Sequence, residues 1–166
     1  MAETPNGNGA TQPDNAGAAS EADQQQFAIQ KIYLKDGSLE TPGTPEVFRQ
    51  SWKPEAKVEL NTRHQAIDEN LHEVVVTVTV TAQMEEKTVY LCEVHQAGVF
   101  TVTGFEDTVR DQLLGAYCPS VLFPYAREAV TDLTAKAGFP PMTLSPVNFD
   151  ALYARRRSSG EERSDG

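Results

Sequence analysis

The clearest pattern in the chain is an alternation of apolar and polar residues between Leu71 and Gly104. Over residues 74–82, apolar side chains occupy every even position, while threonines occupy most odd ones. This is the period of a strand with one apolar and one polar face. Two more β-branched and aromatic runs follow, at 88–96 and 99–103. We therefore predict a β-meander, with a turn at the Ala97-Gly98 pair that separates the last two runs.

Two weaker strands are expected before this meander. Residues 27–35 have the composition of a first strand ending at Asp36-Gly37-Ser38, and a slip in their apolar phase between Ile29 and Ile32 indicates a β-bulge. Two prolines predict a loop over 39–45. Residues 55–61 alternate weakly, as an edge strand does, and precede a polar turn at 62–70.

After Gly104 the apolar period changes to that of a helix. It predicts a helix over 106–117, an interruption at Cys118-Pro119, and a longer helix over 120–137. Gly138 is the expected C-terminal stop of that longer helix.

A last helix is expected to begin at Asn148, an N-cap residue, and to reach Tyr153. The order of strands first and helices second predicts an α+β fold, with an antiparallel sheet covered on one face by two to three helices.

The two ends of the chain differ from its middle in composition. Residues 1–26 and 154–166 contain almost no large apolar side chains, so we expect a disordered N-terminal extension and a disordered C-terminal tail around one domain at 27–153. The chain holds 24 acidic and 14 basic residues, of which seven acids and four bases lie in these ends. The remaining acidic body disfavours nucleic acid and membrane partners and fits a basic protein.

The sequence carries no recognisable reaction centre or metal motif. Its histidines lack metal-ligand spacing, and Cys92 and Cys118 stand alone, as reduced buried thiols do. We therefore expect no catalytic residues, no metal and no cofactor. Because the sequence shows neither a membrane-length apolar run nor a signal-peptide layout, a cytoplasmic location is expected.

The chain carries more apolar surface on one strand and one helix than the core of a monomer would bury. The strand at 89–96 is apolar on both faces, and the helix at 120–137 is apolar along its length. Both features indicate self-association or a docking surface. Phe48, Trp52, Phe100 and Tyr153 could all belong to the core, but Trp52 lies in a proline-flanked loop, where aromatic side chains more often line a groove.

Several strings in the chain are similar to the SecB family of protein-export chaperones. They are Lys35-Asp36, Phe48 with Trp52 and Pro54, Leu91 to Val94, Leu114 to Pro119, Leu122 to Glu128 and Pro146 to Leu152. The resemblance covers about residues 27–153. It implies a four-stranded antiparallel sheet with helices on one side, assembled as a homotetramer that is a dimer of dimers. It also implies an ATP-independent chaperone that holds unfolded precursor proteins and delivers them to the export motor SecA, and no enzymatic activity.

The resemblance also assigns roles to individual positions. The motor contacts fall on Asp36, Glu40, Leu91 and Glu93, and the positions that influence tetramer assembly fall on Cys92, Val94 and Gln96. We add Phe48, Trp52 and Tyr153 as expected lining of the cargo groove. Strand periodicity, read independently, puts Leu91 and Glu93 on one face and Cys92, Val94 and Gln96 on the other.

Two other functions remain open from the sequence. The first is an α+β module that encloses one small ligand, and the second is a SecB-like chaperone that guards an antitoxin. For the export chaperone, the side carrying Val74, Val76 and Val78 is expected to bear the helices, and the Leu91/Glu93 side is expected to be the exposed acidic surface for the motor.

Overall fold

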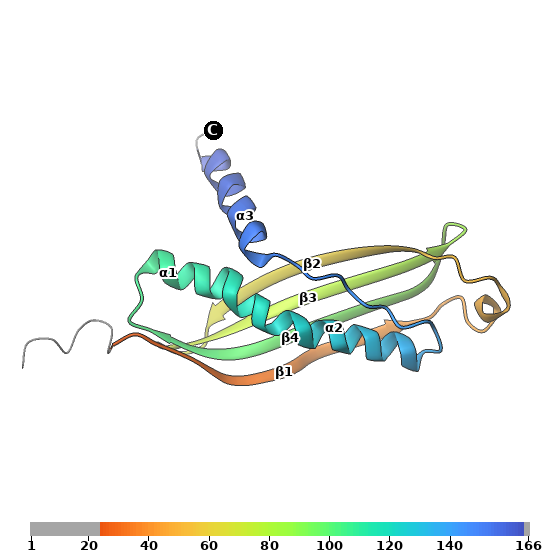
Figure 1. Cartoon of the computed structure of the whole chain (residues 1–166), viewed down its shortest axis with the longest axis horizontal. Coiled ribbons are helices and arrows are strands. Elements are labelled where there is room, and N and C mark those ends of the chain that lie inside the picture. The colour runs from red at the N-terminus through yellow and green to blue at the C-terminus, as the bar shows by residue number, and fades with distance from the viewer. Residues whose placement is uncertain (1–23, 165–166) are drawn as a thin grey trace, which may run out of the picture.

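Four long strands form one antiparallel sheet in the computed structural model, which describes residues 24–164 (Figure 1). The strand order across the sheet is β1-β4-β3-β2, so β1 and β2 are its edges. The strands are β1 (Gln26–Glu40), β2 (Glu55–Ala66), β3 (Leu71–Met84) and β4 (Lys87–Thr103). Most of the predicted N-terminal extension, residues 1–23, lies outside the described residues.

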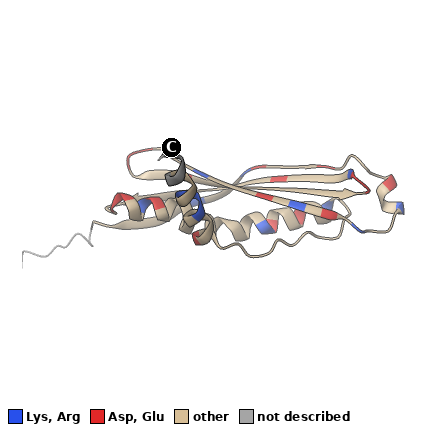
Figure 2. Cartoon of the chain, turned by 90° about the horizontal axis from the view of Figure 1, so that it is seen from above, with Lys and Arg blue, Asp and Glu red and all other residues tan. Residues whose placement is uncertain are grey.

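The helices lie on one side of this sheet, as the view from above shows (Figure 2). One long helical element crosses the sheet and consists of α1 (Asp107–Gln112), a π-helical turn (Leu113–Tyr117) and α2 (Cys118–Lys136). The last helix, α3 (Phe149–Ser164), projects away from the body. This arrangement confirms the α+β class. No helix among residues 24–164 is long and apolar enough to cross a membrane.

The strand register decides which side chains face the helices. Val78 pairs with Val94 and Val80 pairs with Cys92. Because side chains alternate along a strand, Val74 and Cys92 share one face. Both are fully buried, in one core with Leu122 of α2. The predicted helix-bearing side is therefore confirmed.

The turn predicted at Ala97-Gly98 is wrong, because β4 runs without interruption through both residues. Gly98 lies under α2, where an added Cβ would be 2.8 Å from Phe100 Cε2 and 3.0 Å from Leu122 Cδ2. The glycine is thus explained by the close approach of the helix to the sheet. A glycine in a strand pattern can signal either a turn or such an approach, and periodicity alone does not separate the two.

We expect Gly98→Val to destabilise the fold by about 1 to 3 kcal/mol, because its side chain would overpack the contact between Phe100 and Leu122. Urea denaturation followed by circular dichroism measures the loss. Gly160→Ala in α3 is the control, since nothing lies within 4 Å of its added Cβ. A Gly98→Val protein as stable as the wild type would show that α2 can move away at no cost.

Both edge strands are longer than the sequence predicted. β1 continues beyond Asp36 to Glu40, with register shifts between Ile29 and Lys31 and between Leu34 and Asp36. The first shift confirms the expected bulge. β2 continues to Ala66, so the polar turn shrinks to the residues just before Leu71. Polar residues fit these strands because edge strands here are largely exposed.

The interruption predicted at Cys118-Pro119 is also wrong, since the helix runs through both residues. Cys118 donates its N–H to the carbonyl of Leu113, a bond that spans five residues and closes the π-helical turn. Pro119 comes at the start of α2, where its missing N–H is tolerated.

The boundaries of the last elements follow local signals. Gly138 ends α2 in a left-handed conformation with φ of 88°, which confirms the predicted stop. Asn148 accepts a bond from the N–H of Ala151 at 3.0 Å, which confirms the predicted cap. α3 then continues past Tyr153 to Ser164, where the sequence suggested a tail without structure.

Candidate binding surfaces

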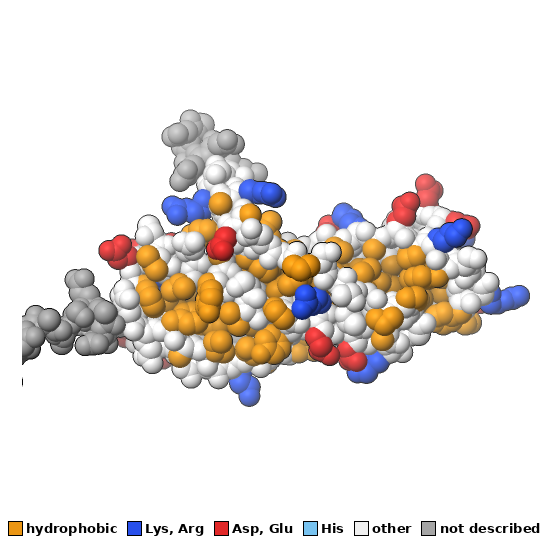
Figure 3. Space-filling view, viewed as in Figure 1, with side chains coloured by type: hydrophobic (Ala, Val, Ile, Leu, Met, Phe, Trp, Pro, Cys, Tyr) orange, Lys and Arg blue, Asp and Glu red, His pale blue; other side chains and the backbone are white. Residues whose placement is uncertain are grey.

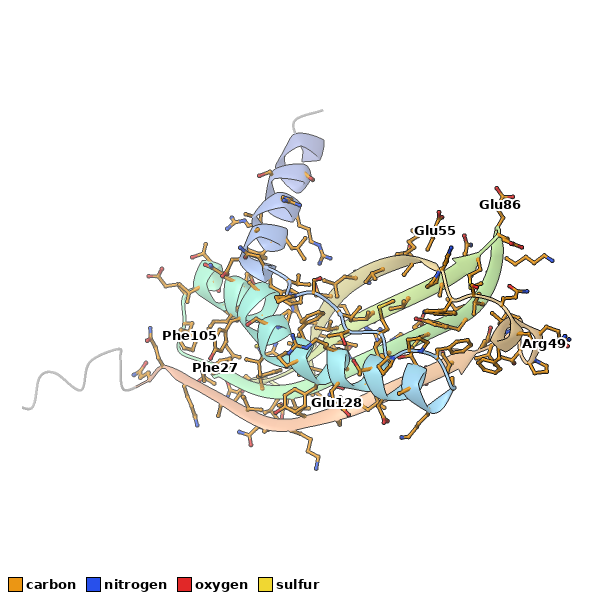
Figure 4. The ribbon with its side chains drawn as sticks, turned by 45° about the vertical axis from the view of Figure 1, so that its right-hand side comes forward. Phe27, Arg49, Glu55, Glu86, Phe105 and Glu128 are labelled. Atoms are coloured by element: carbon orange, nitrogen blue, oxygen red, sulfur yellow. The ribbon has the colours of Figure 1, made fainter. Side chains whose placement is uncertain are left out.

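An aromatic cluster lies at one end of the helix-bearing side. Phe48 follows β1 in a short 3-10 helix (Glu46–Arg49), and its ring centroid is 5.3 Å from that of Phe139. Trp52 is 5.3 Å from Phe139 and stacks on Tyr90 at 6.4 Å. Phe48 remains half exposed. In Figure 4, Arg49 and Glu86 mark this end of the molecule, and Phe27 and Phe105 mark the other. Tyr90 and Phe139 are buried, so the cluster meets solvent through Phe48 and, in part, Trp52.

A second apolar surface runs along edge strand β2. A groove of about 340 Å³ lies between this strand and the extended segment 142–147. Its floor includes Val58 and Leu60, and its walls include Phe123, Met142 and Leu144. Val58 is half exposed. The sequence signal that could have located this groove is the alternation of Val58 and Leu60 on a strand expected to be an edge.

The three residues predicted to line one groove do not come together. Phe48 and Trp52 share the aromatic cluster, whereas Tyr153 lies on α3 against the π-helical turn. An added Cβ at Gly115 would be only 2.7 Å from Tyr153 Cδ2, so the glycine permits this contact. Tyr90 and Phe139 were missed, because each lies far along the chain from Phe48 and only the fold brings them together.

The three positions that the resemblance linked to assembly lie inside the protomer. Cys92 and Val94 are fully buried in the core beneath the helices. Gln96 is nearly buried and donates its side-chain amide to the carbonyl of Tyr33 at 3.0 Å. Burial raises the pKa of the Cys92 thiol to about 11, so it stays protonated.

The opposite side of the sheet carries no helix from residues 24–164, and it holds the four positions linked to the motor. In the β1–β4 register, Glu40 pairs with Leu91, and Asp36 pairs with His95, two residues from Glu93. The second register shift in β1 puts Asp36 and Glu40 on this open face. Asp36 and Glu40 are exposed, and Leu91 and Glu93 are partly exposed. The structure thus brings all four residues together at one end of this side of the sheet. We call the whole side the open face, and the part of it that holds these four residues the acidic face.

Glu93 is held by its neighbours on this face. His95 Nε2 lies 2.7 Å from Glu93 Oε1, and the Thr79 hydroxyl donates to Oε2 at 3.1 Å. These bonds, that from His95 first, lower the pKa of Glu93 below its ordinary value. The Glu93 carboxylate therefore stays ionised, and the two hydrogen bonds fix its orientation.

A second carboxylate on the open face ties three strands together. Glu73 on β3 accepts bonds from Tyr33 on β1, from Lys35 at 2.7 Å and from Gln65 on β2 at 3.3 Å. Tyr33 reaches Glu73 across β4 over Ala97, its register partner. Burial and the bond to Glu73 raise the pKa of Tyr33 to about 12, and the bonds from Lys35 and Tyr33 lower the pKa of Glu73.

We expect Glu73 to contribute stability that depends on pH. Its folded-state pKa is lower than that of an unfolded chain, so its contribution is complete above the unfolded value of about 4.3 and disappears as the pH falls through the folded value. Glu73→Gln should therefore lose about 1 to 2 kcal/mol at pH 7 and approach the wild type in acid. Denaturation between pH 3 and 7 measures the difference. Glu59→Gln is the control, because its partner Lys57 is exposed; an equal effect there would contradict a special role for Glu73.

The outward side of the long helical element is apolar as well. Val109, Tyr117 and Tyr125 are each about half exposed, and no charged residue occurs between Asp111 and Arg127. We call the exposed residues Tyr117, Pro124 and Tyr125, together with the partly exposed Val121, the outer stripe. Figure 3 shows hydrophobic side chains gathered over α1 and the start of α2, and again toward the other end of the sheet. A patch of this kind on a helix that already covers a core marks a contact surface.

These surfaces define a class of protein. Among residues 24–164, no three His, Cys, Asp or Glu side chains come together as a metal site would require. What the fold displays is an aromatic cluster, an apolar groove and an apolar helix surface on one side, and an acidic face on the other. This is an α+β protein built to bind other polypeptides.

Comparison with known proteins identifies the family. A family model described as preprotein translocase subunit SecB matches residues 20–160. The protein-export protein SecB of Alkalilimnicola ehrlichii is 56% identical over 163 residues, covering 97% of this chain and 84% of the relative. That of Halorhodospira halophila is 52% identical over 162 residues, covering 98% and 90%. The chain belongs to the SecB family of protein-export chaperones, which confirms the resemblance seen in its sequence.

A solved structure shares the fold. The Mycobacterium tuberculosis SecB-like chaperone, in complex with a ChAD peptide from the HigA1 antitoxin, matches with a TM-score of 0.59. The two chains are 20% identical over 76% of this chain and 89% of the other. At this identity the likeness supports the four-stranded α+β architecture alone.

Proposed function

We propose that this protein is a cytoplasmic, ATP-independent chaperone that binds unfolded precursor proteins, keeps them competent for export and delivers them to the motor SecA. The observation that carries the proposal is the pair of open apolar surfaces, the aromatic cluster and the β2 groove, on a chain of the SecB family. Surfaces of this kind suit unfolded cargo because apolar burial is non-directional and requires no particular sequence.

The amount of apolar surface sets the strength of cargo binding. Burial contributes roughly 25 cal/mol per Å², so one groove of this size gives weak binding by itself. Several copies on one assembly would hold a long flexible chain far more tightly, because each further contact becomes intramolecular. A multivalent assembly therefore fits the proposed cargo.

The outer stripe supports assembly into a homotetramer, a dimer of dimers. Two copies could pack these apolar helix surfaces together around a two-fold axis. Cys92, Val94 and Gln96 would then act on assembly indirectly, because Cys92 and Val94 belong to the core on which α2 rests and Gln96 is buried on the same face of β4. A change in their volume would shift α2 and the outer stripe with it.

The acidic face supports docking of a basic partner. Asp36, Glu40 and Glu93 lie there with Leu91, which is opposite Glu40, on the side of the sheet away from the apolar surfaces. Cargo and motor would thus bind opposite sides of one sheet, so a loaded chaperone could still dock.

The test is to mix the purified protein with an unfolded, slowly refolding precursor and follow refolding by fluorescence without ATP. We expect a stoichiometric complex and slower refolding. Phe48→Ser combined with Val58→Ser should weaken the effect, because both half-exposed side chains belong to the proposed cargo surfaces. A chain that leaves refolding unchanged, as a module for one small ligand would, contradicts the proposal.

A further inference from the structure

A hydrogen-bonded chain of side chains on the open face ends at Glu93. The hydroxyl oxygen of Thr77 lies 3.3 Å from His95 Nδ1, and His95 Nε2 lies 2.7 Å from Glu93 Oε1. Thr79 donates to the other carboxylate oxygen. Both ring nitrogens of His95 are thus engaged, and because a carboxylate only accepts, Nε2 donates in the bond to Glu93. β3 and β4 together therefore fix both oxygens of one carboxylate.

This arrangement matters because a glutamate on a strand surface is otherwise free to rotate. An exposed glutamate has several rotamers, and ordering them on binding costs conformational entropy. The Glu93 side chain is 42% exposed and that of His95 is 24% exposed. The carboxylate thus remains accessible from solvent, while the ring that holds it is largely shielded.

We propose that His95 is a positioning residue of the acidic face, which orients Glu93 before a basic side chain of the docking partner arrives. The inference rests on the proposed docking of the motor at this face. His95 makes no contact with the partner in this account, and it acts through Glu93 alone. By holding Glu93 in one rotamer beforehand, His95 lowers the entropy that the acidic face and its partner would lose on binding.

Among the charged side chains on the strands around His95, Glu93 is the one that hydrogen-bonds to its ring in the described residues. Across the register, β1 presents Asp36 opposite His95, with no hydrogen bond between them in the described residues. β3 contributes Thr77 and Thr79, which carry no charge. The nearest acid on β2, Glu59, pairs with Thr79 in register and forms an ion pair with Lys57.

A double-mutant cycle tests the proposal, using the full-length protein and the purified SecA motor. Isothermal calorimetry gives the dissociation constants of wild type, His95→Ala, Glu93→Gln and the double variant. We expect His95→Ala to weaken binding about three- to tenfold, and to have no further effect once Glu93 is replaced by Gln. His95→Gln, whose amide can still donate to Glu93, should recover most of the affinity.

Glu40→Gln provides the matched background, because Glu40 lies on the same face without contact to His95. In the Glu40→Gln background, His95→Ala should weaken motor binding as much as it does in the wild type. Equal effects of His95→Ala in the wild-type and Glu93→Gln backgrounds would overturn the positioning role while leaving motor docking intact. A wild-type protein that does not bind the motor would instead contradict the proposed docking itself, and the inference would fail with it. Thermal denaturation of each variant separates either result from loss of folding.

Discussion

A protein carrying Tyr117→Glu and Tyr125→Glu is expected to dissociate from the proposed tetramer into smaller species. Both side chains are about half exposed, and Tyr117 also packs edge-on against Phe27 at 5.3 Å, so circular dichroism must show that the protomer keeps its fold. At an interface, each carboxylate would lose its hydration without gaining a partner. We expect the dissociation constant of the assembly to rise about a hundredfold or more. Light scattering coupled to gel filtration measures the mass.

The control for this experiment adds the same charge elsewhere. Ser158→Glu with Ser159→Glu changes two exposed positions on α3, away from the outer stripe. This variant should keep the wild-type mass, and both variants should keep the wild-type circular dichroism. A stripe variant that remains a tetramer would show that the copies meet through another surface. Cargo holding should also fall in the dissociated protein, because multivalency is lost.

Glu93→Lys is expected to weaken binding of the motor by about thirtyfold or more, while tetramer mass and cargo holding persist. The substitution reverses the charge of the carboxylate that His95 and Thr79 hold toward solvent. A basic partner would then meet a cation next to Leu91 instead of an anion. The dissociation constant measured at two salt concentrations tests the electrostatic origin, because the difference between the proteins should shrink as salt rises.

Glu86→Lys makes the same charge reversal at the β3–β4 hairpin, outside the acidic face. It should leave motor affinity close to that of the wild type, which controls for net charge. If Glu93→Lys instead lowered the mass to that of a dimer and left motor affinity unchanged, the assignment of this face would be wrong. The two largest expected effects therefore concern opposite sides of the same sheet.

Strand periodicity alone separated the two sides of β4. It assigned Leu91 and Glu93 to one face and Cys92 to the other, and the register agrees with this division. The prediction was possible because the direction of each side chain on a regular strand depends only on its position in the strand. The helix-bearing side could be named for the same reason, since the valines of β3 alternate without interruption from Val74 to Val80.

Two local signals were ambiguous without the fold. Gly98 and Pro119 are residues that commonly end strands and helices, yet here each lies within a continuous element. Gly98 makes room for Leu122, and the π-helical turn precedes Pro119 at the start of α2. Both outcomes depend on packing between elements distant in sequence, which a window of neighbouring residues does not contain.

The sequence by itself determined the class of the fold, the family, and the face on which each residue of β3 and β4 lies, because all three follow from short-range patterns and strings of residues. Only the tertiary structure decided which surfaces those residues form. It joined Phe48 and Trp52 to Phe139 while separating them from Tyr153, and it brought Asp36 next to Glu93 through a register shift in β1. The physical reason is that a binding surface is made by contacts between distant segments, and these are fixed by strand register and helix packing.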